Sequence, residues 1–113
     1  MKKILFVASE AVPFIKTGGL ADVVGSLPKY LDKRYFDARV ILPKYMCMKE
    51  EIRNSLEYIG DFYIDYAGSS KYVGVLKKEV EGVTFYFIDN EEYFGGPKPY
   101  GDWLYDIEKF IFF

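Results

Sequence analysis

The residues of this sequence best suited to form a binding site are Lys16, Gly18 and Gly19, because they stand between an apolar run and an amphipathic segment. Glycines let a backbone approach a ligand closely, and the first N–H groups of a helix have no partner within it. The helix dipole favours negative charge at that end, and Lys16 would add a mobile positive charge. The spacing therefore predicts a phosphate site at residues 16–19.

Residue types alone leave a plainer interpretation open, in which the glycines form an ordinary turn and the lysine is solvated. Two well-known phosphate loops are excluded. The sequence has no G-x-x-x-x-G-K-[ST] motif and no G-x-G-x-x-G motif, and the next apolar run ends at Pro43 rather than at an acidic residue. A nicotinamide or flavin dinucleotide is therefore not expected, and we expect no cofactor.

The elements that position these residues form a strand–helix–strand unit. The apolar run from Lys3 is typical of a strand buried on both faces, which we expect at residues 3–9. A second strand is expected at 38–42. Between them, a helix at about 20–33 is indicated by apolar residues at helical spacing: Leu20, Val23, Val24, Leu27 and Leu31.

The rest of the chain predicts an antiparallel hairpin inserted into a parallel sheet. Strands are expected at 58–66 and 72–80, which a short connection makes antiparallel, and at 83–88, which is apolar on both faces and rejoins the central sheet. A loop rich in glycine, proline and aromatic residues at 93–101 precedes a helix whose apolar positions are Trp103, Ile107, Phe110 and Ile111. The fold class is therefore α/β, with a Rossmann-like parallel sheet.

Composition narrows the function classes. With 113 residues, half of them apolar, the chain is expected to form a single core. The net charge of −2, with both signs interspersed, argues against nucleic acid as a partner. No apolar run is long enough for a membrane span, so the cytoplasm is the expected location. The lone Cys47 excludes an internal disulfide, and without histidine no metal cluster is expected.

The run at residues 7–28 resembles the start of bacterial glycogen synthases and plant starch synthases, retaining glucosyltransferases that use ADP-glucose. Its centre is Lys-Thr-Gly-Gly-Leu at 16–20, a motif specific to that family. Three later segments resemble the family in the same order: 38–45, 86–90 and 106–113. The resemblance therefore covers the whole chain.

The resemblance implies a GT-B architecture, in which two Rossmann-like domains face each other across a cleft. Residues 1–113 would be the first part of the N-terminal domain, with its remainder and the C-terminal domain absent. The implied activity is retaining transfer of glucose from ADP-glucose to the non-reducing end of an α-1,4-glucan. By the same resemblance, Lys16 contacts the diphosphate, and Gly18 and Gly19 lie beside the phosphate and the transferred sugar. Asp22 either contacts the ligand near the sugar or is a favourable charge at a helix N-terminus.

The resemblance places the catalytic histidine, and the cations of the second domain, beyond residue 113. No catalytic residue is therefore expected within residues 1–113, and this segment alone is expected to be inactive. The alternative is a non-catalytic module that binds carbohydrate or protein and keeps a vestigial phosphate turn. A terminal helix with an apolar face also predicts that the isolated segment self-associates.

Overall fold

A computed structural model describes residues 1–96, 98–100 and 103–113. The elements in chain order are β1 (Lys2–Val7), α1 (Gly19–Tyr30), β2 (Phe36–Pro43), α2 (Glu50–Asn54), β3 (Glu57–Tyr66), β4 (Ser69–Val80), β5 (Val83–Asp89), α3 (Glu91–Phe94) and α4 (Trp103–Phe112). Each strand predicted from the sequence is present, with ends shifted by a few residues. The helix predicted at 20–33 ends at Tyr30.

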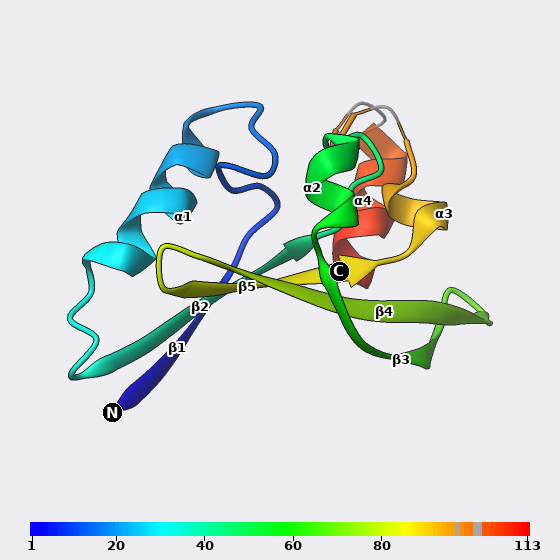
Figure 1. The fold of residues 1–113 in the computed structure, drawn as a ribbon. Helices are drawn as coiled ribbons and strands as arrows, with labels where there is room; N and C mark the ends of the chain where they lie inside the picture. The colour runs from blue at the N-terminus through cyan, green and yellow to red at the C-terminus, as the bar shows by residue number, and fades with distance from the viewer. Residues whose placement is uncertain (97, 101–102) are drawn as a thin grey trace.

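The strands form one mixed sheet in the order β1-β2-β5-β4-β3. β1, β2 and β5 are parallel to one another, and β4 is antiparallel to both β5 and β3. This confirms the predicted parallel sheet with an antiparallel hairpin, and β5 rejoins the centre of the sheet beside β2 as expected. α1 lies over the β1–β2 half, whereas α2, α3 and α4 gather over the other half (Figure 1).

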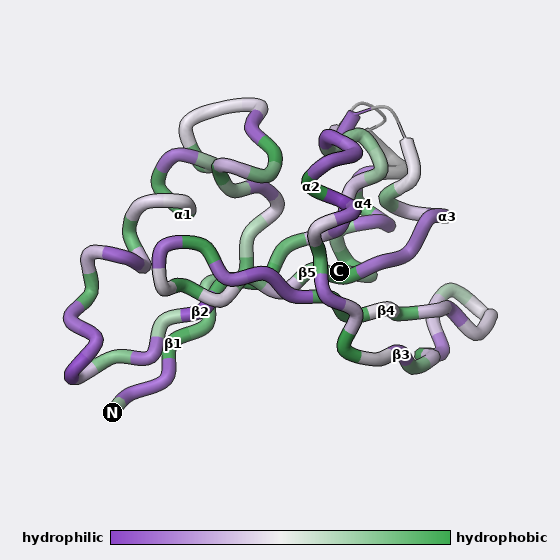
Figure 2. The backbone as a smooth tube through the Cα atoms, in the orientation of Figure 1, coloured by the Kyte–Doolittle hydropathy of each residue, from purple (hydrophilic) through white to green (hydrophobic). Residues whose placement is uncertain are grey.

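The core on the α1 side is built from aromatic and branched side chains. The ring of Phe14 packs edge-on against Phe85 and Phe87, with centroids 4.8 Å away in both cases. Val40 and Leu42 of β2 are fully buried beside them. Figure 2 shows apolar stretches where β1 and β2 run side by side and a largely hydrophilic connection from α1 to β2. The glycine segment is thus attached to a packed sheet.

A second aromatic cluster lies beneath α4. Tyr93 stacks on Phe112 at 4.7 Å, and Tyr66 and Phe94 lie against the same Phe112 ring. Tyr93 and Phe94 are therefore buried and add no exposed aromatic surface next to the terminal helix. Of the predicted apolar face of that helix, Ile107 is exposed, whereas the side chain of Trp103 lies outside the described residues.

Two predictions about burial are wrong. β1 is not buried on both faces, since Leu5 is 54% and Val7 65% exposed. β1 is an edge strand, and only its face that carries Ile4 and Phe6 is partly buried. On α1 the buried residues are Ala21, Val24 and Pro28, while much of the predicted stripe is exposed, namely Leu20, Val23 and Leu27.

None of the described helices is long and apolar enough to cross a membrane.

Candidate functional site

The segment between β1 and α1 is folded back onto the helix that it precedes. The N–H of Ala11 donates to the carbonyl of Ile15 at 3.1 Å, and the N–H of Val12 donates to the carbonyl of Ala21 at 3.0 Å. The Tyr45 hydroxyl donates to the carbonyl of Ser9 at 2.7 Å. These bonds fix the loop at the carboxyl end of β1, where ligands commonly bind in open α/β sheets.

Neither glycine of this loop is required by its own backbone or by packing within the described residues. Gly18 has an extended conformation, and Gly19 does not have a positive φ. A Cβ on Gly18 would meet its nearest atom, Glu10 Oε1, at an ordinary 3.9 Å, and one on Gly19 would meet nothing within 4 Å. At Gly25, by contrast, a Cβ would lie 2.3 Å from Val12 Cγ2. The two loop glycines therefore leave open space at the start of α1.

The structure brings together the four residues predicted to form the site. Lys16 Nζ lies 2.8 Å from Asp22 Oδ2, across the first turn of α1, with Gly18 and Gly19 between them in the chain. Each of the two charged side chains is 53% exposed. An exposed pair of this kind contributes about 0–1 kcal/mol, so Lys16 can exchange Asp22 for a stronger anion at little cost.

The N-terminus of α1 also offers backbone donors. Gly18 is its N-cap residue and supplies no capping side chain. Within the described part of the chain, the N–H groups of Gly19 and Leu20 donate to no other residue. A helix N-terminus with unpaired N–H groups and a nearby ammonium is suited to phosphate.

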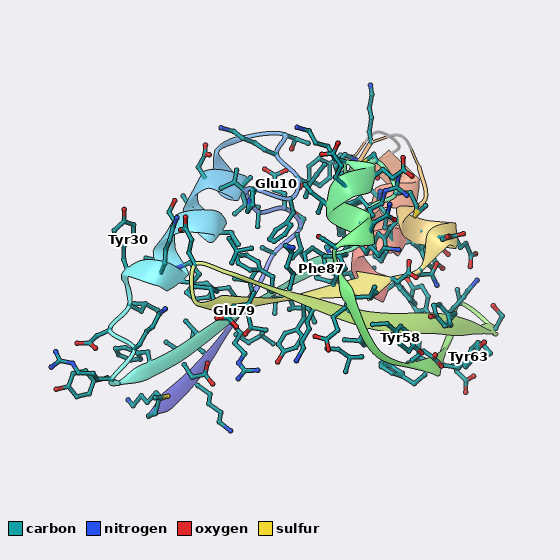
Figure 3. All side chains as sticks on the ribbon, in the orientation of Figure 1. Glu10, Tyr30, Tyr58, Tyr63, Glu79 and Phe87 are labelled. Carbon is teal, nitrogen blue, oxygen red and sulfur yellow. The ribbon has the colours of Figure 1, made fainter. Side chains whose placement is uncertain are left out.

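Glu10 is a functional candidate that the sequence reasoning missed. Its side chain is only 2% exposed, and Figure 3 shows it between the glycine loop and the group of helices α2, α3 and α4. Oε1 accepts the N–H of Gly18 at 3.1 Å, and Oε2 accepts the Thr17 hydroxyl and, at 3.2 Å, the Tyr100 hydroxyl. An acidic residue directly after the strand predicted at 3–9 was the available signal.

The pKa of Glu10 shows which effect dominates at this buried carboxyl. Burial by itself would raise the pKa, since a charged carboxylate loses hydration there. Hydrogen bonds from Thr17, Tyr100 and Gly18, with a further contribution from the backbone of Ala21, outweigh burial and hold the pKa of Glu10 below its usual range. Glu10 is therefore ionised and engaged at neutral pH.

Tyr100 connects the aromatic segment before α4 to this loop. Its hydroxyl lies 2.5 Å from Ser9 Oγ as well as on Glu10 Oε2, and its ring packs against Phe110 of α4 at 5.7 Å. Burial raises the pKa of Tyr100, which remains a neutral hydroxyl. The sequence reasoning did not place Tyr100 at the glycine loop, because its partners there, Ser9 and Glu10, lie some ninety residues earlier.

A hollow of about 440 Å³ lies between β4 and α3 and is a poorer phosphate site. Its lining includes Asp89, Glu91 and Glu92, whose negative charges would repel a phosphate. Burial raises the pKa of Asp89, and its Oδ1 has no hydrogen-bond partner in the described part of the chain. No group of three or more potential metal ligands occurs among the described residues. The loop at 16–22 is therefore the stronger candidate.

Comparisons with known proteins agree on one family. The model of the starch synthase catalytic domain matches residues 3–113. Glycogen synthase from Lachnospira eligens is 64% identical over 114 residues, and that from Lachnoclostridium phytofermentans is 60% identical over 112. The alignments cover 100% and 99% of this chain but only 24% and 23% of those proteins.

A solved structure agrees with the fold. The catalytic domain of starch synthase IV from Arabidopsis thaliana, bound to ADP and acarbose, is similar with a TM-score of 0.81 and 27% sequence identity. The match covers 96% of this chain and 23% of that one. The chain thus spans about a quarter of the length of the relatives that it matches.

Proposed function

The chain belongs to the family of the starch synthase catalytic domain, and on that premise we propose that it forms the first part of the N-terminal domain of an ADP-glucose-dependent glucosyltransferase. The whole protein would transfer glucose, with retention, to the non-reducing end of an α-1,4-glucan in the cytoplasm. The glycogen synthase relatives support this activity. ADP and acarbose in the starch synthase IV neighbour support a nucleotide and a glucan as ligands.

One observation carries the assignment of the site. Two adjacent glycines, which neither backbone conformation nor packing requires, lie beside a lysine at the N-terminus of α1. Space without side chains is explained if a ligand occupies it. We assign Lys16 to the diphosphate of ADP-glucose, and Gly18 and Gly19 to close backbone approach by the phosphate and the transferred sugar. Asp22 would contact the ligand near the sugar.

The chemistry of glucosyl transfer makes use of such a site. As the bond between the anomeric carbon and the diphosphate breaks, negative charge grows on the departing ADP. Lys16 and the backbone N–H groups of α1 would stabilise that charge, and preorganised donors of this kind act most strongly on a developing charge. The described residues of this chain would bind and orient the donor, while the catalytic acid–base groups would come from the rest of the protein.

A chimera tests this function directly. Residues 1–113 would replace the matching segment of the Lachnospira eligens glycogen synthase, and transfer of labelled glucose from ADP-glucose to glycogen would be measured. We expect an active chimera that prefers ADP-glucose to UDP-glucose. We also expect the chain of 113 residues alone to transfer none.

Two outcomes would overturn the proposal. One is a chimera with the unfolding temperature of the parent enzyme but no transfer, which would instead support a non-catalytic carbohydrate- or protein-binding module. The other is full activity after Lys16→Ala in an active chimera, which would make Lys16 a solvated loop residue.

A further inference from the structure

Glu10 presents an electrostatic problem that its hydrogen bonds explain. An ionised carboxylate lies buried behind the loop that we assign to an anionic ligand, where its charge opposes binding. Burial of such a charge is costly unless it is hydrogen-bonded. Both of its oxygens are engaged by the loop itself, through the Gly18 N–H and the Thr17 hydroxyl. The carboxylate is therefore held by donors of the loop itself.

The hydrogen bonds of Glu10 lie at the N-terminus of α1, where a capping side chain would otherwise act. Helices are usually capped by the side chain of the N-cap residue, which accepts an N–H of the first turn. The N-cap residue of α1 is Gly18, which has no side chain. From the loop after β1, Glu10 accepts the N–H of the N-cap residue Gly18 itself, and the backbone of Ala21, in the first turn of α1, also lowers the pKa of Glu10. Glu10 thus supplies a cap from outside the helix.

Capping from behind keeps the front of the loop free of side chains. A Cβ at position 18 would meet only Glu10 Oε1, at 3.9 Å, so a small side chain such as serine could begin there without a clash. Such a residue would also cap α1 without Glu10. The sequence nevertheless carries glycine at this position, with the capping oxygen eight residues earlier.

Tyr100 extends the same network to the opposite side of the loop. Its hydroxyl contacts Glu10 Oε2 and Ser9 Oγ, and its ring lies on Phe110 of α4. The Ser9 carbonyl is in turn held by Tyr45, which follows β2. Two other parts of the chain, at Tyr45 and at Tyr100, therefore hold Ser9 and Glu10 at the start of the loop, which limits the freedom of the loop.

We propose that Glu10 is a positioning residue for the nucleotide diphosphate, acting as an external cap of α1 that allows Gly18 and Gly19 to remain open to the ligand. Tyr100 orients the Glu10 carboxylate. This inference rests on the proposed function of the loop and deepens it. It assigns no contact between Glu10 and the ligand.

The test uses the chimera and compares Glu10→Ala, Glu10→Gln and Tyr100→Phe, with Glu51→Gln on the exposed surface of α2 as a matched control. Glu10→Ala should weaken ADP binding, measured by calorimetry, by about tenfold or more, as expected when a charged hydrogen-bond partner is lost. The KM for glycogen should remain unchanged. Glu10→Gln, which keeps an acceptor for the Gly18 N–H, should recover part of the affinity, and Tyr100→Phe should have a smaller effect in the same direction.

A double variant separates positioning from simple stabilisation. Glu10→Ala combined with Gly18→Ser gives α1 a cap of its own, so the unfolding temperature should return while ADP affinity does not, because the serine side chain occupies the open space. Gly18→Ser alone, with Glu10 intact, should keep the fold and lose ADP affinity. This single variant provides the measurement if Glu10→Ala does not fold.

Three outcomes would overturn the positioning role. They are unchanged ADP affinity in Glu10→Ala, recovery of both stability and affinity in the double variant, or unchanged affinity in Gly18→Ser. The proposed function fails in a different way, since Lys16→Ala would then also leave ADP binding and transfer intact. A loss of function in Lys16→Ala with none in Glu10→Ala would preserve the function and refute only the positioning role.

Discussion

Lys16 and Asp22 form an ion pair of 2.8 Å across the first turn of α1, although six positions separate them in the chain. The pair keeps the lysine ammonium at the first turn of α1. Because both side chains are half exposed, the pair is weak and can be exchanged. A charge that is already placed near its target loses less freedom on binding than one on an unrestrained side chain.

The first prediction concerns Lys16→Ala in the active chimera. Loss of this cation should cost about 2–4 kcal/mol in kcat/KM for ADP-glucose, by analogy with removal of one charge-stabilising donor. Since Lys16 is on an exposed loop, the free energy of unfolding should change by less than about 0.5 kcal/mol. Lys16→Arg should rescue only partly, because a guanidinium is planar and wider. Steady-state kinetics and thermal unfolding of the three proteins test this, and equal losses in both measurements would contradict it.

The second prediction distinguishes the two interpretations of Asp22. Asp22→Asn removes the ion pair and a favourable charge in the first turn of α1, which should cost at most about 1 kcal/mol of stability. If Asp22 contacts the ligand near the sugar, kcat/KM for ADP-glucose should fall while the Kd for ADP, which lacks the sugar, is retained. Calorimetry with ADP and kinetics with ADP-glucose measure the two. Equal retention of both would leave Asp22 as a helix-end charge.

The third prediction compares two glycines of the same helix. Gly25→Ala places a Cβ 2.3 Å from Val12 Cγ2 and 2.6 Å from the Val12 carbonyl oxygen, so the backbone must move. Overpacking of this kind should destabilise the fold by about 1–3 kcal/mol. Gly19→Ala meets nothing within 4 Å and should leave stability nearly unchanged while weakening ADP binding. Chemical denaturation and ADP titration of both variants test this; a stable Gly25→Ala would show that α1 packs more loosely than described.

α1 shows which features of a helix a sequence pattern predicts and which it does not. Its existence follows from spacing, but its buried face does not, because Leu20, Val23 and Leu27 are exposed while Ala21 and Val24 are buried. Gly25 lies directly against Val12, so the helix approaches the preceding loop along its small residues. Periodicity of large apolar residues records which side of a helix is apolar, and it does not record which side can approach most closely.

The candidate site was predictable only where it is local in sequence. Lys16, Gly18 and Gly19 lie within four positions, and their types alone indicate an anion site. Glu10 can be recognised as part of the site only from its hydrogen bonds, and one of its partners, Tyr100, is ninety residues away in the chain. No short pattern encodes a contact between the end of β1 and a segment before α4, so this network required the three-dimensional arrangement.

The fourth prediction is a pH dependence that originates at Glu10. Because the folded-state pKa of Glu10 is held below the ordinary value of 4.5, its contribution to stability is present above that pH and is lost as the pH falls through the folded pKa. Thermal unfolding of the chain and of Glu10→Gln should differ most near neutrality, and the difference should shrink below pH 4.5 and disappear as the pH falls through the folded-state pKa of Glu10. A difference that stays constant from neutrality down to acid would show that the Glu10 charge adds nothing.

The last prediction is that the isolated chain self-associates through apolar surface at its sheet edges and on α4. Leu5 and Val7 are exposed on edge strand β1, Phe62 is exposed on edge strand β3, and Ile107 and Ile111 are exposed on α4. At about 25 cal/mol per Å², burial of a few hundred Å² of such surface would contribute several kcal/mol to association. Unpaired edge strands also pair readily with other chains.

Analytical ultracentrifugation over a concentration series would measure this association. The chain should form dimers or larger species, and Val7→Lys or Ile111→Lys should shift it toward monomer, because each places a charge on one of these apolar surfaces. Glu50→Lys, on the exposed surface of α2, adds positive charge elsewhere and should leave the association unchanged apart from its salt dependence. A chain that remains monomeric at high concentration would contradict the prediction. It would show that exposure of these apolar surfaces does not drive association and that the core formed by these residues is sufficient.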